Sequence, residues 1–464
     1  MKRVGGKFFY RHLSKKQIIA LCHFRVGEID GVSLEMDKWK MTLEELGHHV
    51  IYIAGSSGSL DNVEIIQELH YNDADNNKIV ENAYIRYHSF NSEQSFKNKI
   101  ENIAKSIEEK LINIIEKNKI DILIVNNIFS LGWNLSAGVG FFSAIKKTDV
   151  KCICHHHDFS WERKKYSNPT LPFIADYLNN YFPPKHTRLK HIVINSIAQK
   201  ELLKRKNIKS IIIPNVFDFD KVWKIDDYNF DFRESFGIKK NDLIVLQATR
   251  IVKRKGIELA IDFVAELCKN KHRLIGKKLY NNLIFTANNN IVFLMVGSNE
   301  DDPYFEKITK YAHKKQIVIK WVNKNIDHLR SQKNDTKTYS LWDAYVHCDI
   351  VAYTSLLEGW GNQFIEALVA KKIIISYQYP VFKNDIIPLK FNTVDLGNKH
   401  NLKEDGLTQV NHTIIVKAVN DCIALILNKE KYKQTVLENY NIGKKNLSLN
   451  TLKKLLKPIV ENEK

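Results

Sequence analysis

Two carboxylates on either side of a glycine-rich turn are the residues of this sequence best suited to chemistry. Glu358 comes directly before the segment Gly-Trp-Gly, and Glu366 follows within the next predicted helix. Glycines let a ligand approach the backbone closely, and free N–H groups at the start of a helix bind anions. Carboxylates beside them can accept hydrogen bonds from hydroxyl groups. The stretch therefore predicts a site for a ligand that carries both phosphate and sugar hydroxyls.

The elements around this turn are those of a parallel α/β sheet. The apolar run 350–353 predicts a buried strand, and apolar side chains at helical spacing predict a helix after Gly361. This order places the turn at the carboxyl end of a strand, where α/β sheets bind their ligands.

A second group of polar side chains follows the predicted strand 150–154. The sequence continues His155-His-His-Asp-Phe-Ser-Trp-Glu-Arg163, which crowds aromatic, cationic and acidic side chains into one loop. We interpret this loop as functional rather than as an ordinary polar loop, because it follows a parallel strand. Three consecutive histidines point in different directions, so the sequence predicts no metal site here.

Composition indicates a packed enzyme with two domains. The chain has 464 residues, of which 44% are hydrophobic and 11% aromatic, and this length suffices for two cores. Six cysteines without framework spacing favour buried thiols in a reducing compartment over disulfides or a metal site. The sequence contains no run of about 18 apolar residues, so it predicts no membrane-spanning helix. We therefore expect a cytoplasmic protein.

The formal net charge of +18 has two interpretations. One is an anionic partner, and the other, which we favour, is compositional drift in a lysine-rich chain. The basic residues are scattered and match no RNA- or DNA-binding fingerprint, so we expect no nucleic-acid partner. Peripheral contact with the inner face of a membrane stays open, because a basic surface would suffice for it.

Alternating apolar runs and helical patterns predict an α/β fold with two doubly wound, Rossmann-like domains. We expect an N-terminal domain over 1–225, a second domain over 226–440, and a basic C-terminal helix over 441–464 that packs back on the first domain. Residues 1–16 are a basic leader and 378–412 an irregular insert, both without an assigned role.

The first predicted helix begins near Ser33, which we expect to be its N-cap, and a long amphipathic helix covers 94–118. The predicted strands lie at 18–22, 50–53, 121–126, 150–154, 191–194, 211–216, 243–248, 291–297, 318–321, 350–353 and 372–376.

The second half of the chain resembles the retaining glycosyltransferases of family 4, which have the GT-B fold of two domains facing across a cleft. Arg250 and Lys255, the latter followed by a glycine, come after one predicted strand, and Gly297 ends another. Glu358 and Glu366 are similar to the family's pair of glutamates separated by seven residues. Each motif alone is weak, whereas the ordered set is specific.

The first half also looks like this family, although the chain departs from the family pattern in both halves. Gly31 in the first loop, the pair His157-Asp158 at a strand end, and Pro-Asn-Val at 214–216 are similar to family features. The first loop has no second glycine beside Gly31, and Thr249 stands where the family often has glycine.

The resemblance implies transfer from a nucleotide diphosphate sugar without a metal or another cofactor. Arg250 and Lys255 would stabilise the charge that builds on the departing phosphate. Glu358 would accept a hydrogen bond from a sugar hydroxyl, Glu366 would hold the ribose, and His157 would face the sugar from the first domain. The other residues implied in donor binding are Gly31, Gly297, Gly361, Asn362 and Gln363.

The acceptor would bind the first domain, at Asp158, Trp161 and Arg163. Arg163 suggests an anionic acceptor, small or lipid-linked, with a phosphate or a carboxylate. The loop sequences resemble a subgroup that includes mannosylglucosyl-3-phosphoglycerate synthases. GDP-mannose would then be the donor, and a UDP-hexose stays open.

Two other classes stay open at this point. A GT-B epimerase would convert a nucleotide sugar without an acceptor, and a GT-B phosphorylase would need a lysine for pyridoxal phosphate that the sequence does not identify. A basic nucleic-acid-binding protein would bind unrelated oligonucleotides with a steep salt dependence.

Overall fold

The computed structural model describes residues 16–28, 30–327, 329–333 and 336–461, and these fold into two compact units. Unit 1 comprises the described residues up to 194, 198–213 and those from 449 onward, and unit 2 comprises 195–197 and 214–448. The division therefore lies earlier than the boundary expected at 226, and the last helix joins unit 1 from 449 rather than 441. Of the expected basic leader, residues 1–15 lie outside the described residues.

Unit 1 is built on a seven-stranded parallel sheet in the order β3-β2-β1-β4-β5-β6-β7. β1 and β4 at its centre are almost wholly buried and rich in Ile, Val and Leu, as a parallel sheet covered on both faces requires, whereas the buried part of β5 consists of Cys, Ile and His. Their carboxyl ends meet at one edge of the sheet. The strands are β1 Ile18–Cys22, β2 His49–Ala54, β3 Val63–Ile65, β4 Ile122–Asn126, β5 Lys151–His156, β6 Leu189–Val193 and β7 Ser210–Ile212.

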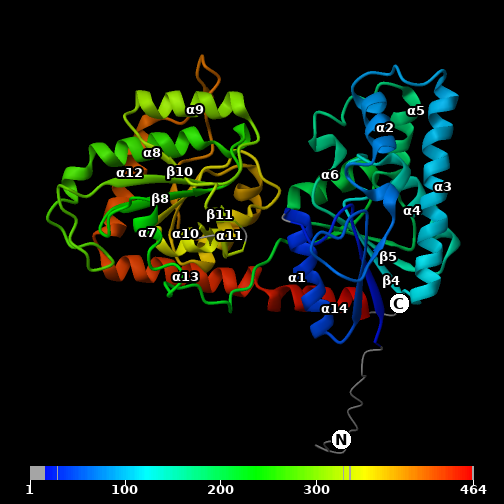
Figure 1. Cartoon of the computed structure of the whole chain (residues 1–464), viewed down its shortest axis with the longest axis horizontal. Helices are drawn as coiled ribbons and strands as arrows, with labels where there is room; N and C mark the ends of the chain where they lie inside the picture. The colour runs from blue at the N-terminus through cyan, green and yellow to red at the C-terminus, as the bar shows by residue number, and fades with distance from the viewer. Residues whose placement is uncertain (1–15, 29, 328, 334–335, 462–464) are drawn as a thin grey trace, which may run out of the picture. The chain divides into compact units, whose positions relative to one another are not determined.

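Helices cover both faces of this sheet (Figure 1). α3 packs against α4, and side chains of both join the buried cluster that contains Leu123 and Cys152. α1 lies beside α14, and Trp39 of α1 stacks on His155 with ring centroids 4.3 Å apart. The helices are α1 Gly31–Glu45, α2 Ala74–Tyr84, α3 Glu93–Asn118, α4 Leu135–Lys147, α5 Pro172–Tyr181, α6 Ser196–Lys206, whose first two residues are assigned to unit 2, and α14 Leu449–Glu461.

The N-cap of the first helix differs from the sequence prediction. The cap is Asp30, whose carboxylate accepts hydrogen bonds from the backbone N–H groups of Val32 and Ser33. The expectation that Ser33 caps the helix is wrong, because Ser33 lies in the first turn and its hydroxyl donates to Asp30 at 2.5 Å. Aspartate is a strong N-cap because it satisfies N–H groups that have no partner within the helix.

Unit 2 repeats this architecture with a six-stranded parallel sheet in the order β10-β9-β8-β14-β15-β16. Its strands are β8 Leu243–Ala248, β9 Ile291–Val296, β10 Ile319–Trp321, β14 Ile350–Tyr353, β15 Ile373–Ser376 and β16 Val394–Asp395. Two small sheets accompany it, formed by β11 Ile326–Asp327, β12 Ser331–Lys333 and β13 Thr336–Ser340, and by β17 Asn401–Leu402 and β18 Thr408–Gln409.

Helices flank the unit 2 sheet, and α8 lies next to both α9 and α12 (Figure 1). The insert expected at 378–412 contains a π turn, a 3-10 turn and the short strands β16, β17 and β18. The helices are α7 Phe232–Ser235, α8 Ile257–Lys269, α9 Asp302–Lys314, α10 Leu341–His347, α11 Asn362–Val369, α12 His412–Ile426 and α13 Lys429–Leu447.

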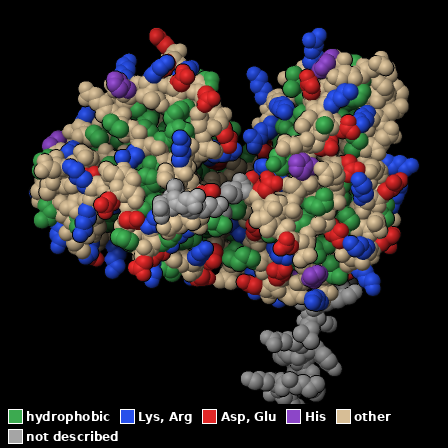
Figure 2. All heavy atoms as spheres, in the orientation of Figure 1, with side chains coloured by type: hydrophobic (Ala, Val, Ile, Leu, Met, Phe, Trp, Pro, Cys, Tyr) green, Lys and Arg blue, Asp and Glu red, His purple; other side chains and the backbone are tan. Residues whose placement is uncertain are grey.

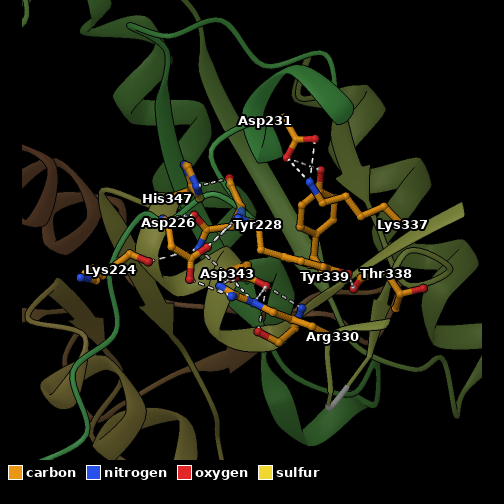
Figure 3. A network of polar contacts seen from close by, with 12 residues as sticks. Lys224, Asp226, Tyr228, Asp231, Arg330, Lys337, Thr338, Tyr339, Asp343 and His347 are labelled. Carbon is orange, nitrogen blue, oxygen red and sulfur yellow. Dashed lines mark hydrogen bonds and ion pairs between the residues drawn. The ribbon is translucent and has the colours of Figure 1, made fainter. Parts of the chain in front are cut away.

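A polar network fastens the start of unit 2 to α10 (Figure 3). Arg330 Nη1 lies 2.7 Å from Asp226 Oδ2, and Arg330 Nη2 lies 2.5 Å from Asp343 Oδ1. The Asp343 side chain is fully buried and also accepts a hydrogen bond from Asn229 Nδ2 at 2.7 Å. His347 Nε2 bonds to the Asn229 carbonyl at 2.8 Å. The network therefore holds the first loop of unit 2 on its core.

The charge on the visible surface is mixed. Figure 2 shows Lys and Arg side chains spread among acidic and neutral ones, in keeping with the scattered basic residues of the sequence. Among the described helices, none has the length and apolar character needed to cross a membrane.

Candidate active site

The glycine turn lies at the carboxyl end of β14, near the middle of the unit 2 sheet. Gly361 has a φ of 111° and caps α11, and a Cβ there would lie 1.8 Å from the Tyr353 hydroxyl oxygen. Only glycine fits this position. The Tyr353 hydroxyl lies 2.6 Å from that of Tyr379, which donates to the Trp360 carbonyl. These contacts fix the turn, so that α11 begins at the strand end.

Glu358 is the centre of a buried ion cluster. Its Oε1 lies 2.5 Å from Lys255 Nζ, and its Oε2 lies 2.6 Å from Arg254 Nη1. The Glu358 and Lys255 side chains are only 10% and 12% exposed. Both cations come from the 3-10 turn Lys253–Lys255 that follows β8, the strand next to β14. Two neighbouring strand ends thus bring together two predicted catalytic residues, Glu358 and Lys255.

One carboxylate facing two cations sets the protonation of this cluster. Burial acts to raise the pKa of the Glu358 carboxyl, but Lys255 and Arg254 outweigh burial and hold that pKa below its ordinary value. Burial lowers the pKa of the Lys255 ammonium; Glu358 opposes this effect, and Arg254 and Arg250 add to it. The cluster keeps a surplus positive charge and can bind an anion such as phosphate.

Arg250 lies at the edge of this cluster and has a different partner. Its Nη1 forms an ion pair with Glu300 at 2.9 Å, and its side chain is 52% exposed. It is close enough to lower the pKa of Lys255. Exposed pairs contribute little to stability, so Glu300 can release the guanidinium to an incoming anion at small cost.

Two residues in the first turn of α11 that were predicted to bind the sugar donor are held in place by side-chain hydrogen bonds. Gln363 is buried, and its Nε2 donates to the Ala352 carbonyl at 3.1 Å, which ties α11 to β14. Asn362 Oδ1 accepts from Asn215 Nδ2 at 2.8 Å. Their side chains anchor the helix, and an anion can use their backbone N–H groups, which begin the helix.

The position of Glu366 suits ligand binding, whereas the position of Gly297 is explained by packing. The Glu366 carboxylate accepts a hydrogen bond from the buried Tyr345 hydroxyl at 2.7 Å, which orients it for hydroxyl ligands. Gly297 ends β9 with a φ of 141°, and a Cβ there would lie 2.2 Å from the Thr249 carbonyl oxygen. Gly297 therefore has a packing reason to be glycine, because it lets the ends of β8 and β9 approach.

In unit 1, His157 and Asp158 follow β5 and are held by Asn127. Asn127 Oδ1 accepts from the His157 backbone N–H at 2.8 Å, and its Nδ2 donates to Asp158 Oδ1 at 3.0 Å. Burial, with a smaller effect of His23, lowers the pKa of the His157 imidazole to about 3. The ring is therefore neutral and can exchange hydrogen bonds with a hydroxyl group.

The residues predicted to bind the acceptor contact one another and their neighbours. Asp158 Oδ2 accepts from Arg163 Nε at 2.8 Å and also from Nη2. The Trp161 ring stacks on Phe159 with centroids 4.4 Å apart, and the Arg205 guanidinium lies over it at 5.5 Å. Arg163 is half exposed, so an anionic acceptor there would compete with Asp158 for the guanidinium.

Gly31 is the first residue of α1 and lies beside a carboxylate. A Cβ at Gly31 would meet nothing within 4 Å, so there is room next to its backbone. Asp30 caps the helix and pairs with Arg25 at 3.2 Å. A negative charge thus occupies the helix start beside Gly31, a residue that the resemblance implies in donor binding.

Arg254 and Asn127 are site residues that the sequence analysis missed. Arg254 belongs to a basic run in which only Lys255 was singled out. Asn127 follows a strand and has a φ of 56°, a conformation that asparagine tolerates better than most residues. For Asn127, the available signal was an asparagine directly after a strand. Arg254 becomes apparent only through its contact with Glu358.

Two family models match this chain, one in each half. The model described as Glycosyltransferase Family 4 matches residues 36–221, which contain His157 and Arg163. The model described as Glycosyl transferases group 1 matches residues 229–398, which contain the cluster around Glu358.

The chain is also similar to two curated relatives and to a solved structure. Mannosylglucosylglycerate synthase of Petrotoga mobilis is 40% identical over 427 residues, which cover 92% of this chain and 97% of that protein. The protein of the same name from Thermotoga maritima is 36% identical over 444 residues, covering 94% and 98%. A glycosyltransferase structure from Rickettsia africae has a TM-score of 0.59 and 20% identity, covering 97% and 100%.

Proposed function

This chain belongs to the family 4 glycosyltransferases with the GT-B fold, in the subgroup of the mannosylglucosylglycerate synthases, and we propose that it transfers a mannosyl unit from GDP-mannose to a hydroxyl of glucosylglycerate. The observation that carries the proposal is the surplus positive charge of Lys255 and Arg254 around Glu358. The name of the two relatives, mannosylglucosylglycerate synthase, supports the choice of mannose and of a glycerate-bearing acceptor.

The ion cluster supports the donor half of the proposal. When the bond between the anomeric carbon and the β-phosphate oxygen breaks, negative charge builds on the phosphate. Lys255 and Arg254 would share their N–H groups between Glu358 and the phosphate, and Arg250 would leave Glu300 to join them. Each charge-assisted hydrogen bond contributes about 1.5–3 kcal/mol, and the bonds strengthen as the charge grows in the transition state. These cations would stabilise the leaving group without a metal ion.

The sugar and the nucleotide would be oriented by carboxylates. Glu358 would accept a hydrogen bond from a mannosyl hydroxyl, and Glu366, oriented by Tyr345, would accept from the ribose hydroxyls. The neutral His157 ring would face the sugar. The acceptor oxygen would bond to the anomeric carbon on the face that the phosphate leaves, its proton would pass to a phosphate oxygen, and the anomeric configuration would be retained.

The acceptor half of the proposal rests on charge. Glucosylglycerate carries a carboxylate, which would compete with Asp158 for the half-exposed guanidinium of Arg163. Trp161 would supply an apolar wall beside it. A phosphorylated acceptor would fit the same cation, so acceptors of both kinds belong in the experiment.

The test is a panel of donors and acceptors with the purified chain. GDP-mannose and the common UDP-hexoses are each combined with glucosylglycerate, glucosyl-3-phosphoglycerate, glucose or no acceptor, and release of nucleotide diphosphate is measured. We expect release only with GDP-mannose and glucosylglycerate together, and an α-linked product by NMR. A preference for another donor, an inverted product, or conversion of the donor without an acceptor would overturn the proposal.

A further inference from the structure

A cluster of thiol and imidazole groups lies inside unit 1, away from the residues assigned above. Side chains alternate between the two faces of a strand, so Cys152, Cys154 and His156 of β5 share one face. In the register of the sheet, His191 of the neighbouring β6 lies opposite Cys154. All four side chains are buried, with exposed fractions of 5% or less.

The potential ligand atoms converge. Cys154 Sγ and a ring nitrogen of each of His156 and His191 lie within 4.8 Å of one another. His156 Nε2 is 3.0 Å from His191 Nδ1, and Cys152 Sγ is 3.9 Å from Cys154 Sγ. A tetrahedral zinc ion with Zn–N of about 2.0–2.1 Å and Zn–S of about 2.3 Å holds its ligand atoms about 3.3–3.8 Å apart. Small side-chain shifts would therefore bring the ligand atoms of Cys154, His156 and His191 to coordination distance.

The His156 nitrogen opposite the site already has the kind of partner that a metal-bound histidine needs. His156 Nδ1 lies 2.7 Å from Ser130 Oγ, and the backbone of Pro184 also makes a hydrogen bond with the His191 ring. Such outer partners fix the tautomer and orientation of a ligating imidazole. Without a metal, a proton shared by His156 Nε2 and His191 Nδ1 would occupy the place that the ion would take.

We propose that Cys154, His156 and His191 bind one Zn²⁺ ion in unit 1. Two imidazole nitrogens and one thiolate sulfur are ligands that zinc takes, and they leave its fourth position to a ligand from outside this group. Binding would release the Cys154 thiol proton to solvent, and the proton between the two imidazoles would move to the opposite nitrogen of its ring. The ion would tie β5 to β6 directly before His157, so it would position that residue and take no part in sugar transfer.

Among the described residues, these three form the one group of histidine, cysteine and carboxylate side chains with this geometry. The sequence analysis predicted no metal here, because consecutive histidines on a strand face opposite sides. That reasoning separates His155 from His156, but the second imidazole comes from another strand. The inference is independent of the proposed function, since it concerns buried groups that the transfer reaction does not use.

The test is metal analysis of the full chain. The protein is produced in zinc-supplemented medium, dialysed against metal-free buffer, and analysed by plasma mass spectrometry. We expect about one zinc per chain. Cys154→Ser and His191→Gln should each lower this at least tenfold, whereas Cys268→Ser, at a cysteine of α8 in unit 2, should leave it unchanged. Circular dichroism checks the fold of each variant.

Cobalt supplies a second readout that does not depend on the variants. Wild-type chain refolded with Co²⁺ should show the near-ultraviolet thiolate-to-cobalt band and the strong visible bands of a tetrahedral site. Less than a tenth of a zinc per chain in the zinc-supplemented preparation, or octahedral cobalt without a thiolate band, would overturn the proposal and leave a hydrogen-bonded histidine pair. Zinc retained in folded Cys154→Ser, or another metal at full occupancy, would also overturn it.

Discussion

Replacing Glu358 with glutamine should destabilise unit 2 more than removing either cation that it holds. Glu358→Gln keeps the size of the side chain but leaves the Lys255 ammonium, 12% exposed, without its carboxylate. Removing one partner of a buried ion pair costs about 3–5 kcal/mol. We expect about 3 kcal/mol, because Arg254 is 29% exposed and keeps its hydrogen bond to the Leu357 carbonyl.

Replacing Lys255, the cationic partner, should cost less free energy of unfolding than replacing Glu358. Lys255→Met leaves Glu358 paired with Arg254 and removes a cation that burial already disfavours, so we expect a loss of about 1.5 kcal/mol. The double variant combines Glu358→Gln with Lys255→Met. Both charges of the buried pair are then absent, so neither is left buried without its partner. The cost of the double variant should therefore fall below the sum of the single variants by about 1–2 kcal/mol.

Urea unfolding followed by tryptophan fluorescence measures these free energies, since Trp360 is buried beside Glu358. Hydrogen exchange of peptides from β8 and β14 identifies the transition that belongs to unit 2. Asp421→Asn is the matched control, because Asp421 pairs with Lys417 on the exposed face of α12 and should matter by less than about 0.5 kcal/mol. Single-variant costs that add within about 0.5 kcal/mol, or Glu358→Gln no costlier than the control, would refute the reasoning.

Four further predictions concern other parts of the molecule. Arg250→Ala and Glu366→Ala should each lower the rate of transfer at least about 100-fold without changing circular dichroism, and near-normal turnover in either would remove that residue from the site. Arg163→Ala should raise the KM of a carboxylate-bearing acceptor about tenfold and that of a neutral analogue hardly at all; equal effects would argue against an anionic acceptor at this residue. Burial lowers the pKa of His347 to about 4 from 6.5, so the unfolded chain binds the proton first and unit 2 should lose stability as pH falls from about 6.5 to about 4, by up to about 3 kcal/mol. Urea unfolding at several pH values should show this slope and show it reduced in His347→Gln, whereas an unchanged slope would assign it to other groups. Arg330→Lys should destabilise unit 2 by about 2 kcal/mol in the same assay, because lysine cannot reproduce the forked contact with two aspartates, and wild-type stability would show that the network in Figure 3 contributes little.

The fold was predictable where local sequence determines it. The run at 350–353 formed β14 and the following segment formed α11, because apolar strands, glycine turns and helical spacing are local patterns. The long helix expected over 94–118 was confirmed as Glu93–Asn118. The N-cap was misplaced because Asp30 and Ser33 are both good caps, and the choice depends on the backbone at Asp30.

The site was less predictable because its contacts join distant parts of the sequence. Arg254 belongs to the site because it pairs with Glu358, which follows a different strand. Asn127 belongs to it because it contacts His157, in the loop after the neighbouring strand of the sheet. Similarly, His191 meets His156 only because β6 pairs with β5. Residue types at strand ends indicated where chemistry occurs, whereas pairing between strands determines which side chains meet.

The central claim is that Lys255 and its neighbours hold the diphosphate of a sugar donor. Its most direct test compares acceptor-dependent release of GDP from GDP-mannose by wild-type chain and by Lys255→Ala, with Lys310→Ala as the control because Lys310 is 83% exposed on α9. We predict a loss of about 10²–10³-fold in kcat/KM for Lys255→Ala, with circular dichroism preserved and the control unchanged. Turnover by folded Lys255→Ala within about threefold of the wild type, a difference of only about 0.65 kcal/mol, would contradict the account.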